Sequence, residues 1–256
     1  MLSDLKTWQW FLVLLGGFLV GIGKGGLPGV SNLTVALFAL VFPAKLSAGI
    51  LLPVLICADM SAVIIYRKHA EWKYVARLMP STVVGIIMGY LLLDSISDRF
   101  VSVLIGSILL TMTGLHFYRK YKMQQSAAEA EDTLPHTFAF ITTTGIAGGF
   151  ATMVANAAGP VAAMYLLAVG LPKYAFIGTS AWFFMIINWF KVPLQLSLGN
   201  ISSATIGLSL TVGIAAVLGT LVAPKLVKHI PQKLFERIIW FFIILAGIRL
   251  LWDAVF

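Results

Sequence analysis

The chain has 256 residues, of which 59% are hydrophobic and 11% are charged, and its formal net charge is +8. Soluble domains carry about 25% charged residues, and a chain this apolar has too few polar groups to cover a water-exposed surface. This composition excludes a soluble enzyme, a nucleic-acid-binding domain and a disordered chain, and the single cysteine, Cys57, excludes a disulfide framework. The sequence therefore predicts an all-α polytopic membrane protein with about eight hydrophobic segments.

Apolar runs separated by polar stretches follow one another along the chain. They cover residues 8–41, 46–65, 75–93, 100–118, 137–169, 174–190, 201–223 and 234–255. Six of these runs have ordinary membrane-spanning length, whereas the first and the fifth are much longer. As one helix, either long run would reach roughly 50 Å, against a hydrocarbon core of about 30 Å. The first run also lacks a small-residue cleavage site, so we expect it to be part of the fold rather than a signal peptide.

Glycine, proline and polar residues interrupt both long runs. Residues 16–29 contain seven glycines together with Lys24 and Pro28. The second run contains Asn156 and the pair Gly159-Pro160 near its middle. Irregular backbone at membrane depth is tolerated only inside protein or beside a water-filled cavity. We therefore expect two broken helices whose halves, of about 12–16 residues, are rather short to span.

The two halves of the chain resemble each other. Residues 21–32 align with 145–156, with five identical positions that include Asn32 and Asn156. After a shift of five residues, Asp59 aligns with Asn188. Each half then consists of a broken or re-entrant helix element followed by three transmembrane helices. The sequence predicts a membrane repeat over 1–122, a cytoplasmic linker over 123–135 and a second membrane repeat over 136–256.

The positive charges indicate how the repeats are oriented, because short loops rich in lysine and arginine face the cytoplasm. If both broken elements are re-entrant hairpins, the cytoplasmic side holds twelve such residues: Arg67, Lys68, Lys73, Arg77, Arg119, Lys120, Lys122, Lys173, Lys225, Lys228, Lys233 and Arg237. Four lie outside: Lys6, Lys45, Arg99 and Lys191. If the broken elements crossed the membrane instead, the split would be a weaker nine to seven. We therefore expect two inverted repeats with both termini outside, an arrangement that recurs in transporters.

Lys24 is the strongest candidate for a functional side chain. An ionisable group inside a membrane segment is costly, and is a functional candidate by default. Gly25 and Gly26 would let the backbone approach a ligand closely, and the helix that restarts after Pro28 would offer free N–H groups to an anion. We expect these three residues to bind substrate. The alternatives are a lysine that pairs with an acid, and glycines that serve helix packing.

Four further polar or glycine positions complete the candidate site. Asn32 and Asn156 follow the two breaks, where each could contact substrate or cap the restarting helix. Gly159 would shape the tip of the second hairpin. Asp59 lies well inside an apolar segment, so it could bind a proton and couple it to transport, or it could neutralise Lys24 as a structural ion pair.

The glycine-rich break Gly21-Ile22-Gly23-Lys24-Gly25-Gly26, the second break ending in Gly159-Pro160 and the duplicated layout resemble the TauE/SafE sulfite exporter family. The resemblance covers nearly the whole chain. It implies a secondary carrier of the bacterial inner membrane that moves small sulfur-containing anions, such as sulfite or an organosulfonate. Members of that family differ in substrate, and Lys24 stands where other members have only small residues.

These observations together predict an alternating-access exporter of a small anion, with Asp59 as the candidate proton acceptor. A passive anion channel and a non-transporting accessory protein are the alternatives. We expect no enzyme activity, because the membrane segments lack the paired histidines or carboxylates of an intramembrane enzyme. We also expect no cofactor and no metal site. The expected partners are the small anion and the lipid bilayer, with no nucleic acid, and the oligomeric state is open.

Overall fold

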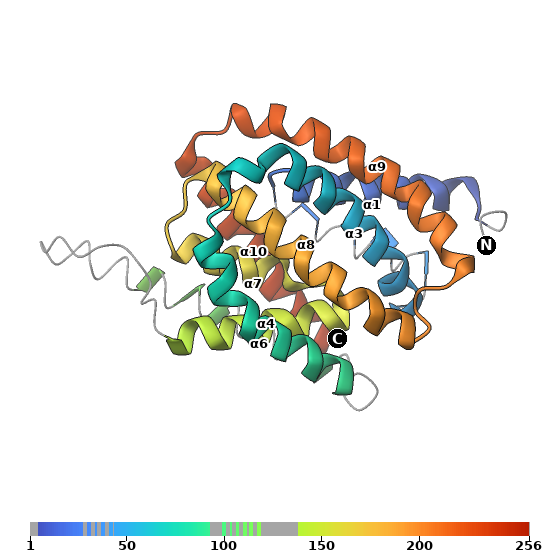
Figure 1. Ribbon diagram of the computed structural model, residues 1–256, viewed down its shortest axis with the longest axis horizontal. Coiled ribbons are helices and arrows are strands. Elements are labelled where there is room, and N and C mark those ends of the chain that lie inside the picture. The colour runs from blue at the N-terminus through green and yellow to red at the C-terminus, as the bar shows by residue number, and fades with distance from the viewer. Residues whose placement is uncertain are drawn as a thin grey trace, which may run out of the picture. The chain divides into compact units, whose positions relative to one another are not determined.

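The computed structural model describes the chain except for residues 1–4, 93–98, 119–137 and 256, and for scattered positions within 28–43 and 101–116. The described residues form helices and turns, with no strand among them. Figure 1 labels the helices, whose bounds are α1 Thr7–Lys24, α3 Ala44–Tyr66, the 3₁₀ turn η2 Arg67–His69, α4 Trp72–Leu92, α6 Phe138–Ala155, α7 Ala158–Ala168, α8 Lys173–Ser197, α9 Ser203–Lys228 and α10 Gln232–Val255. The predicted all-α fold is confirmed for these residues.

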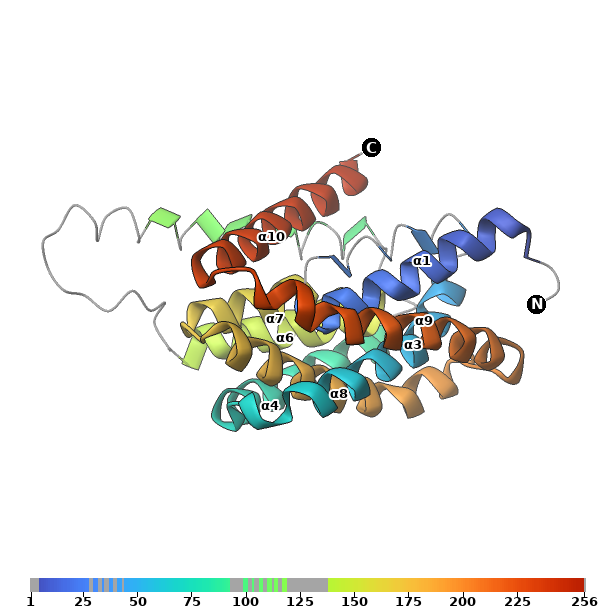
Figure 2. The ribbon, with the colours of Figure 1, turned by 90° about the horizontal axis from the view of Figure 1, so that it is seen from above.

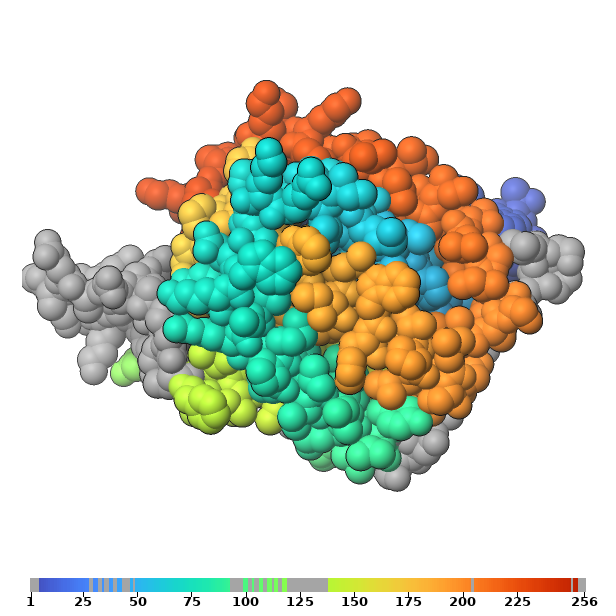
Figure 3. All heavy atoms as spheres, in the orientation of Figure 1, coloured from blue at the N-terminus to red at the C-terminus, as the bar shows by residue number. Residues whose placement is uncertain are grey.

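Six helical segments in the described part of the chain are long and apolar enough to cross a membrane. They are Thr7–Lys24, Gly49–His69, Trp72–Leu92, Phe138–Ala155, Lys173–Ser197 and Thr205–Lys228. Large apolar side chains on α9 are exposed at intervals of three or four residues, at Leu210, Ile214, Leu218 and Leu221. Such a stripe fits contact with lipid, and Figure 3 shows side chains of α8 and α9 in orange at the surface. The chain is a multi-pass membrane protein, although eight spanning segments are not all found.

The helices pack into two compact units. Unit 1 comprises residues 1–75 and 173–235, and unit 2 comprises residues 76–172 and 236–256. Each unit thus takes helices from both predicted repeats. The units are defined by packing and the repeats by sequence similarity, so the predicted repeat boundaries stay a prediction.

The first broken element folds back on itself within unit 1. Helix α1 ends at Lys24, and the chain then turns through Gly26, whose φ is +156°. Beyond the turn, the Thr34 hydroxyl donates a hydrogen bond of 2.9 Å to the carbonyl oxygen of Gly16, 18 residues earlier. A straight helix would place these two residues about 27 Å apart. The 18-residue α1 is nevertheless long and apolar enough to cross a membrane, so the expectation of a half-helix that is short for a span was wrong here.

The second broken element folds back in the same way within unit 2. Helix α6 ends at Ala155, and Asn156 takes a left-handed φ of +53° before α7 begins. The rings of Phe140 and Tyr165 lie 6.4 Å apart between centroids, on opposite arms of the turn. Helices α6 and α7 lie beside one another, as Figure 2 shows. Both long runs therefore fold back on themselves. Helix α6 also has 18 residues and is long and apolar enough to cross a membrane, so the expected short half-helix is not found, and re-entrance stays a prediction.

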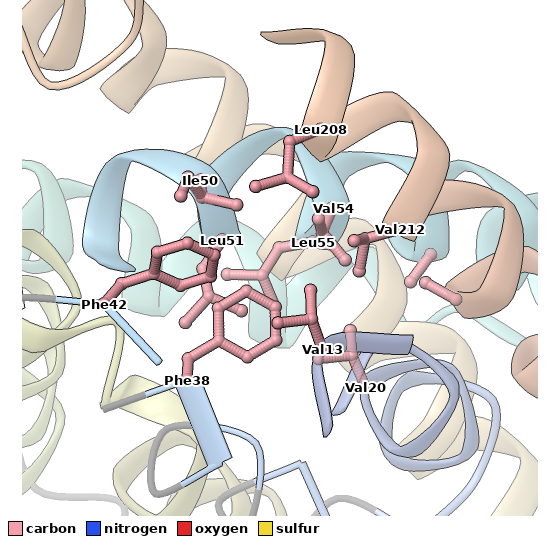
Figure 4. Close-up of a cluster of buried hydrophobic side chains, with 12 residues drawn as sticks. Val13, Val20, Phe38, Phe42, Ile50, Leu51, Val54, Leu55, Leu208 and Val212 are labelled. Atoms are coloured by element: carbon pink, nitrogen blue, oxygen red, sulfur yellow. The ribbon is translucent and has the colours of Figure 1, made fainter. Parts of the chain in front are cut away.

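A buried apolar cluster holds α1, α3 and α9 together in unit 1. It consists of Val13, Val20, Phe38, Phe42, Ile50, Leu51, Val54, Leu55, Ala58, Leu208, Val212 and Ala216. Figure 4 shows side chains of α1, α3 and α9 converging on the two phenylalanines. Ala58 belongs to the cluster, so the packing fixes the part of α3 that carries the neighbouring Asp59.

Glycines let α1 approach the backbone of α9. An added Cβ on Gly21 would lie 2.6 Å from the Thr220 nitrogen and 2.8 Å from the Gly219 Cα. Gly17 and Gly25 face α9 in the same way. The small-residue row thus serves close helix packing.

We expect Gly21→Ala to lower the free energy of unfolding by about 1–3 kcal/mol, because the backbone of α9 cannot move away as a flexible side chain could. The measurement is the thermal unfolding midpoint of the purified protein in detergent. Gly114→Ala is the matched control, since an added Cβ there meets no described atom within 4 Å. Equal midpoints for the two variants would contradict the packing role of Gly21.

Candidate functional site

Lys24 and Asp59 form an ion pair inside unit 1. Lys24 is the last residue of α1 and Asp59 lies in the middle of α3. The Nζ of Lys24 is 2.8 Å from Oδ1 of Asp59, and the two side chains are 10% and 0% exposed. The structure therefore brings together the two intramembrane ionisable residues that the sequence singled out. This contact matches the alternative in which Asp59 neutralises Lys24 as a structural ion pair. A proton-coupling role for Asp59 stays a prediction.

Asn188 contacts the other oxygen of the Asp59 carboxylate. Its Nδ2 donates a hydrogen bond of 2.6 Å to the second oxygen of Asp59. Asn188 belongs to α8, which packs beside α3 (Figures 1 and 2). The two positions that the repeat alignment pairs, 59 and 188, are thus in direct contact. Asn188 is 1% exposed, so this hydrogen bond is shielded from solvent.

Lys191 is a second buried lysine, although the distribution of positive charges in the sequence predicted that it lies outside the membrane. Helix α8 continues through Pro193 to Ser197, so Lys191 lies inside the helix, and its side chain is 0% exposed. It follows Asn188 by three residues and therefore shares its face of the helix. Its charge acts on both Lys24 and Asp59. The expectation that Lys191 lies outside the membrane was wrong, because the candidate membrane-spanning helix α8 does not end before its proline.

An aromatic ring also contacts Lys24. The ammonium nitrogen lies 3.7 Å from the ring centroid of Phe184, one turn before Asn188 on α8. A cation over an aromatic face is stabilised electrostatically, more so when it is removed from water. Lys24 is thus held from two sides, by the carboxylate on α3 and by the ring on α8.

Phe184→Leu keeps an apolar side chain but removes the ring face, so we expect it to cost roughly 1–2 kcal/mol of stability through Lys24. A double-mutant cycle with Lys24→Met isolates this pairwise contribution. The control is Phe190→Leu, on the same helix but more exposed. A coupling energy of zero between Phe184 and Lys24 would show that the ring does not stabilise the ammonium.

Tyr66 stabilises the end of α1, next to Lys24. Its hydroxyl donates a hydrogen bond of 2.8 Å to the carbonyl oxygen of Gly25, so a backbone acceptor freed at the end of α1 is satisfied. Gly25 and Gly26 themselves pack against α9, where an added Cβ would overlap Ala223 or Val227. Close packing thus accounts for both glycines, and a contact with substrate stays a prediction for each.

The remaining predicted site residues belong to other parts of the chain. Asn156 and Gly159 lie in unit 2, where Asn156 is in the turn between α6 and α7 and Gly159 is in the first turn of α7. Asn156 ends α6, and its N–H donates to the carbonyl oxygen of Thr152 at 3.1 Å. The N-cap of α7 is Ala157, so the expectation that Asn156 caps the restarting helix was wrong. Asn32 and the start of the helix after Pro28 lie outside the described residues.

Residues 13–250 of the chain match the family model described as Sulfite exporter TauE/SafE. No curated protein and no solved structure matched the chain. The family match covers most of both predicted repeats and includes all four residues of the buried polar cluster Lys24, Asp59, Asn188 and Lys191. The protein therefore belongs to the TauE/SafE sulfite exporter family of membrane transporters.

Proposed function

We propose that the protein is a secondary transporter of the bacterial inner membrane that exports a small sulfur-containing anion, such as sulfite or an organosulfonate. The family supplies the class of activity. The observation that carries the site is the buried lysine at the end of a broken helix, paired with a buried carboxylate. Ionisable groups at such breaks mark substrate and ion pathways in transporters.

The ion pair suggests how an anion would be exchanged. A buried charge is stable only when it is paired. Lys24 is paired with Asp59, and an arriving anion would compete with that carboxylate. Protonation of Asp59 removes the competitor and leaves the ammonium for the anion. Asp59 is therefore the proposed proton acceptor, and Lys24 the proposed anion ligand.

Two features support inverted repeats with re-entrant hairpins. Both broken elements fold back on themselves. The packing of the two hairpins is also reciprocal, because Gly21 meets α9 within unit 1, whereas the aligned Gly145 meets Leu78 and Ser81 of α4 within unit 2. Helices α4 and α9 occupy equivalent places in the two predicted repeats. Alternating access would then come from movement of one repeat against the other.

Binding can be tested without knowing the substrate. A thermal-shift screen of the purified protein compares sulfite, thiosulfate, sulfoacetate, taurine, sulfate and phosphate, since a ligand that binds only the folded state raises the unfolding temperature. We expect one or more sulfur anions to stabilise the protein more than phosphate does. Flux of that anion into proteoliposomes should saturate and show counter-transport. Linear flux without counter-transport would indicate a channel, and absence of binding and flux would indicate an accessory protein.

The proposed topology places both termini outside. We expect a periplasm-active reporter fused after Phe256 to be active, because each repeat would cross the membrane three times. A reporter active only in the cytoplasm is the comparison. Activity of that second reporter would reject the re-entrant arrangement.

A further inference from the structure

The amide oxygen of Asn188 is a buried acceptor beside the ion pair of Lys24 and Asp59. Asn188 is 1% exposed, and its Nδ2 donates a hydrogen bond of 2.6 Å to Asp59. Its Oδ1, by contrast, accepts a hydrogen bond from none of the described residues. Most buried polar atoms in proteins are paired, because an unpaired acceptor away from water costs stability. Oδ1 therefore suits a donor that these parts of the chain do not supply.

The carboxylate of Asp59 fixes which way this amide points. An asparagine amide has a donor end and an acceptor end. If it were turned over, Oδ1 would face the carboxylate oxygen, and the two acceptors would repel each other. The oxygen that binds Nδ2 can accept whether Asp59 is ionised or carries a proton on its other oxygen. The acceptor end therefore points away from Asp59 in both states of the proposed cycle.

Lys24 lies beside the face of α8 that carries Asn188. Its ammonium nitrogen is 3.7 Å from the ring centroid of Phe184, and residues four apart on a helix, such as Phe184 and Asn188, are neighbours on one face. The same ammonium is 2.8 Å from the carboxylate that Asn188 binds. Two separate contacts within unit 1 thus bring the cation and the amide to one place. A cationic donor and a neutral acceptor together match an anion that also carries an O–H or N–H group.

We propose that Asn188 is a specificity-determining residue, whose Oδ1 accepts a hydrogen bond from the transported anion. This inference rests on the proposed anion transport and narrows its substrate class. The substrate is then a sulfur anion with a hydrogen-bond donor of its own. Such a donor is the O–H group of hydrogensulfite, or a hydroxyl or amino group on an organosulfonate. A site built around an acceptor rejects an analogue without the donor, because the buried acceptor is then left unpaired.

The test compares dissociation constants within matched pairs of monoanions, measured by calorimetry on the purified full chain in detergent. One pair is hydrogensulfite and methanesulfonate in mildly acidic buffer, and the other is 2-hydroxyethanesulfonate and ethanesulfonate. We expect the donor-bearing member of at least one pair to bind roughly tenfold more tightly, or better, than its partner. A smaller preference in both pairs, or tightest binding by donor-free thiosulfate, would overturn the inference while leaving anion binding intact. Absence of binding by all these anions would overturn the proposed transport function and this inference with it.

Asn188→Leu assigns the preference to a residue, because leucine has nearly the size of asparagine but no acceptor. We expect the preference within the pair to disappear. The variant also loses the hydrogen bond to Asp59, but that loss affects both members of a pair alike, so the ratio of their constants isolates Oδ1. Asn200→Leu, between α8 and α9, is the matched control and should keep the preference. An undiminished preference in Asn188→Leu would overturn the role of Asn188, and the comparison in the unmodified protein decides the need for a donor if this variant does not fold or bind.

Discussion

Replacing Lys24 with methionine is expected to abolish saturable anion transport and the thermal stabilisation that the anion produces. Methionine keeps most of the length and apolar character of the side chain but has no charge to pair with the anion. Its contact with Phe184 can persist as an apolar contact, so the loss would be specific to the charge. The measurement is uptake of the best-binding sulfur anion into proteoliposomes. Lys73→Met, at an exposed position of α4, is the matched control and should transport normally.

A loss of folding must be separated from a loss of binding in this variant. Removing Lys24 leaves Asp59 buried without its ion-pair partner, and breaking a buried pair costs about 3–5 kcal/mol. The double variant Lys24→Met/Asp59→Asn removes the stranded charge, so it should recover most of this stability while still failing to transport. Normal uptake by either variant would refute Lys24 as the anion ligand.

Asp59→Asn is expected to uncouple transport from the proton gradient. Asparagine has nearly the size of aspartate and can still pair with Asn188, but it cannot take up a proton at neutral pH. Exchange of thiosulfate across the membrane should therefore continue, whereas accumulation against a concentration gradient should be lost. The measurement compares exchange and accumulation in the same proteoliposomes, with an imposed pH difference. Accumulation at the unmodified level would exclude Asp59 as the coupling residue.

The contact between Asp59 and Asn188 offers a stringent control for this result. Because the two side chains are joined by a hydrogen bond of 2.6 Å, the double variant Asp59→Asn/Asn188→Asp moves the carboxylate across that bond without changing the composition of the cluster. We expect proton-driven accumulation to return in part. An absence of any recovery would mean that the carboxylate must stand on α3 to pair with Lys24.

Much of the site follows from simple rules applied to the sequence. Lys24 and Asp59 stand out because ionisable residues are rare in membrane segments, and the repeat alignment pairs Asp59 with the residue it contacts. Lys191 was missed because a lysine two residues before Pro193 is typical of a helix end. Helix α8 instead continues past this proline. The spacing of Asn188, Lys191 and Gln195, all buried on one helical face, is the signal that could have revealed it.

The position at which α1 ends depends on packing against α9 rather than on local sequence preferences alone. Glycine weakens an isolated helix, so the glycine-rich part of the first run, residues 16–29, was expected to interrupt it. Helix α1 continues to Lys24 because Gly17 and Gly21 allow the backbone of α9 to approach it closely. This contact joins segments nearly two hundred residues apart, and no local pattern in α1 specifies it.

The contact between positions 59 and 188 has a consequence for how such a site could arise. On the proposed duplication, these positions descend from one residue, which in a symmetric ancestral dimer would have faced its own copy. Two facing carboxylates would repel each other, and two facing amides would offer Lys24 no counter-charge. Joining the two copies in one chain frees them to differ, so that one keeps the acid and the other becomes its hydrogen-bond donor. A single titratable group at this contact is therefore something that a fused gene can encode and a dimer of identical subunits cannot.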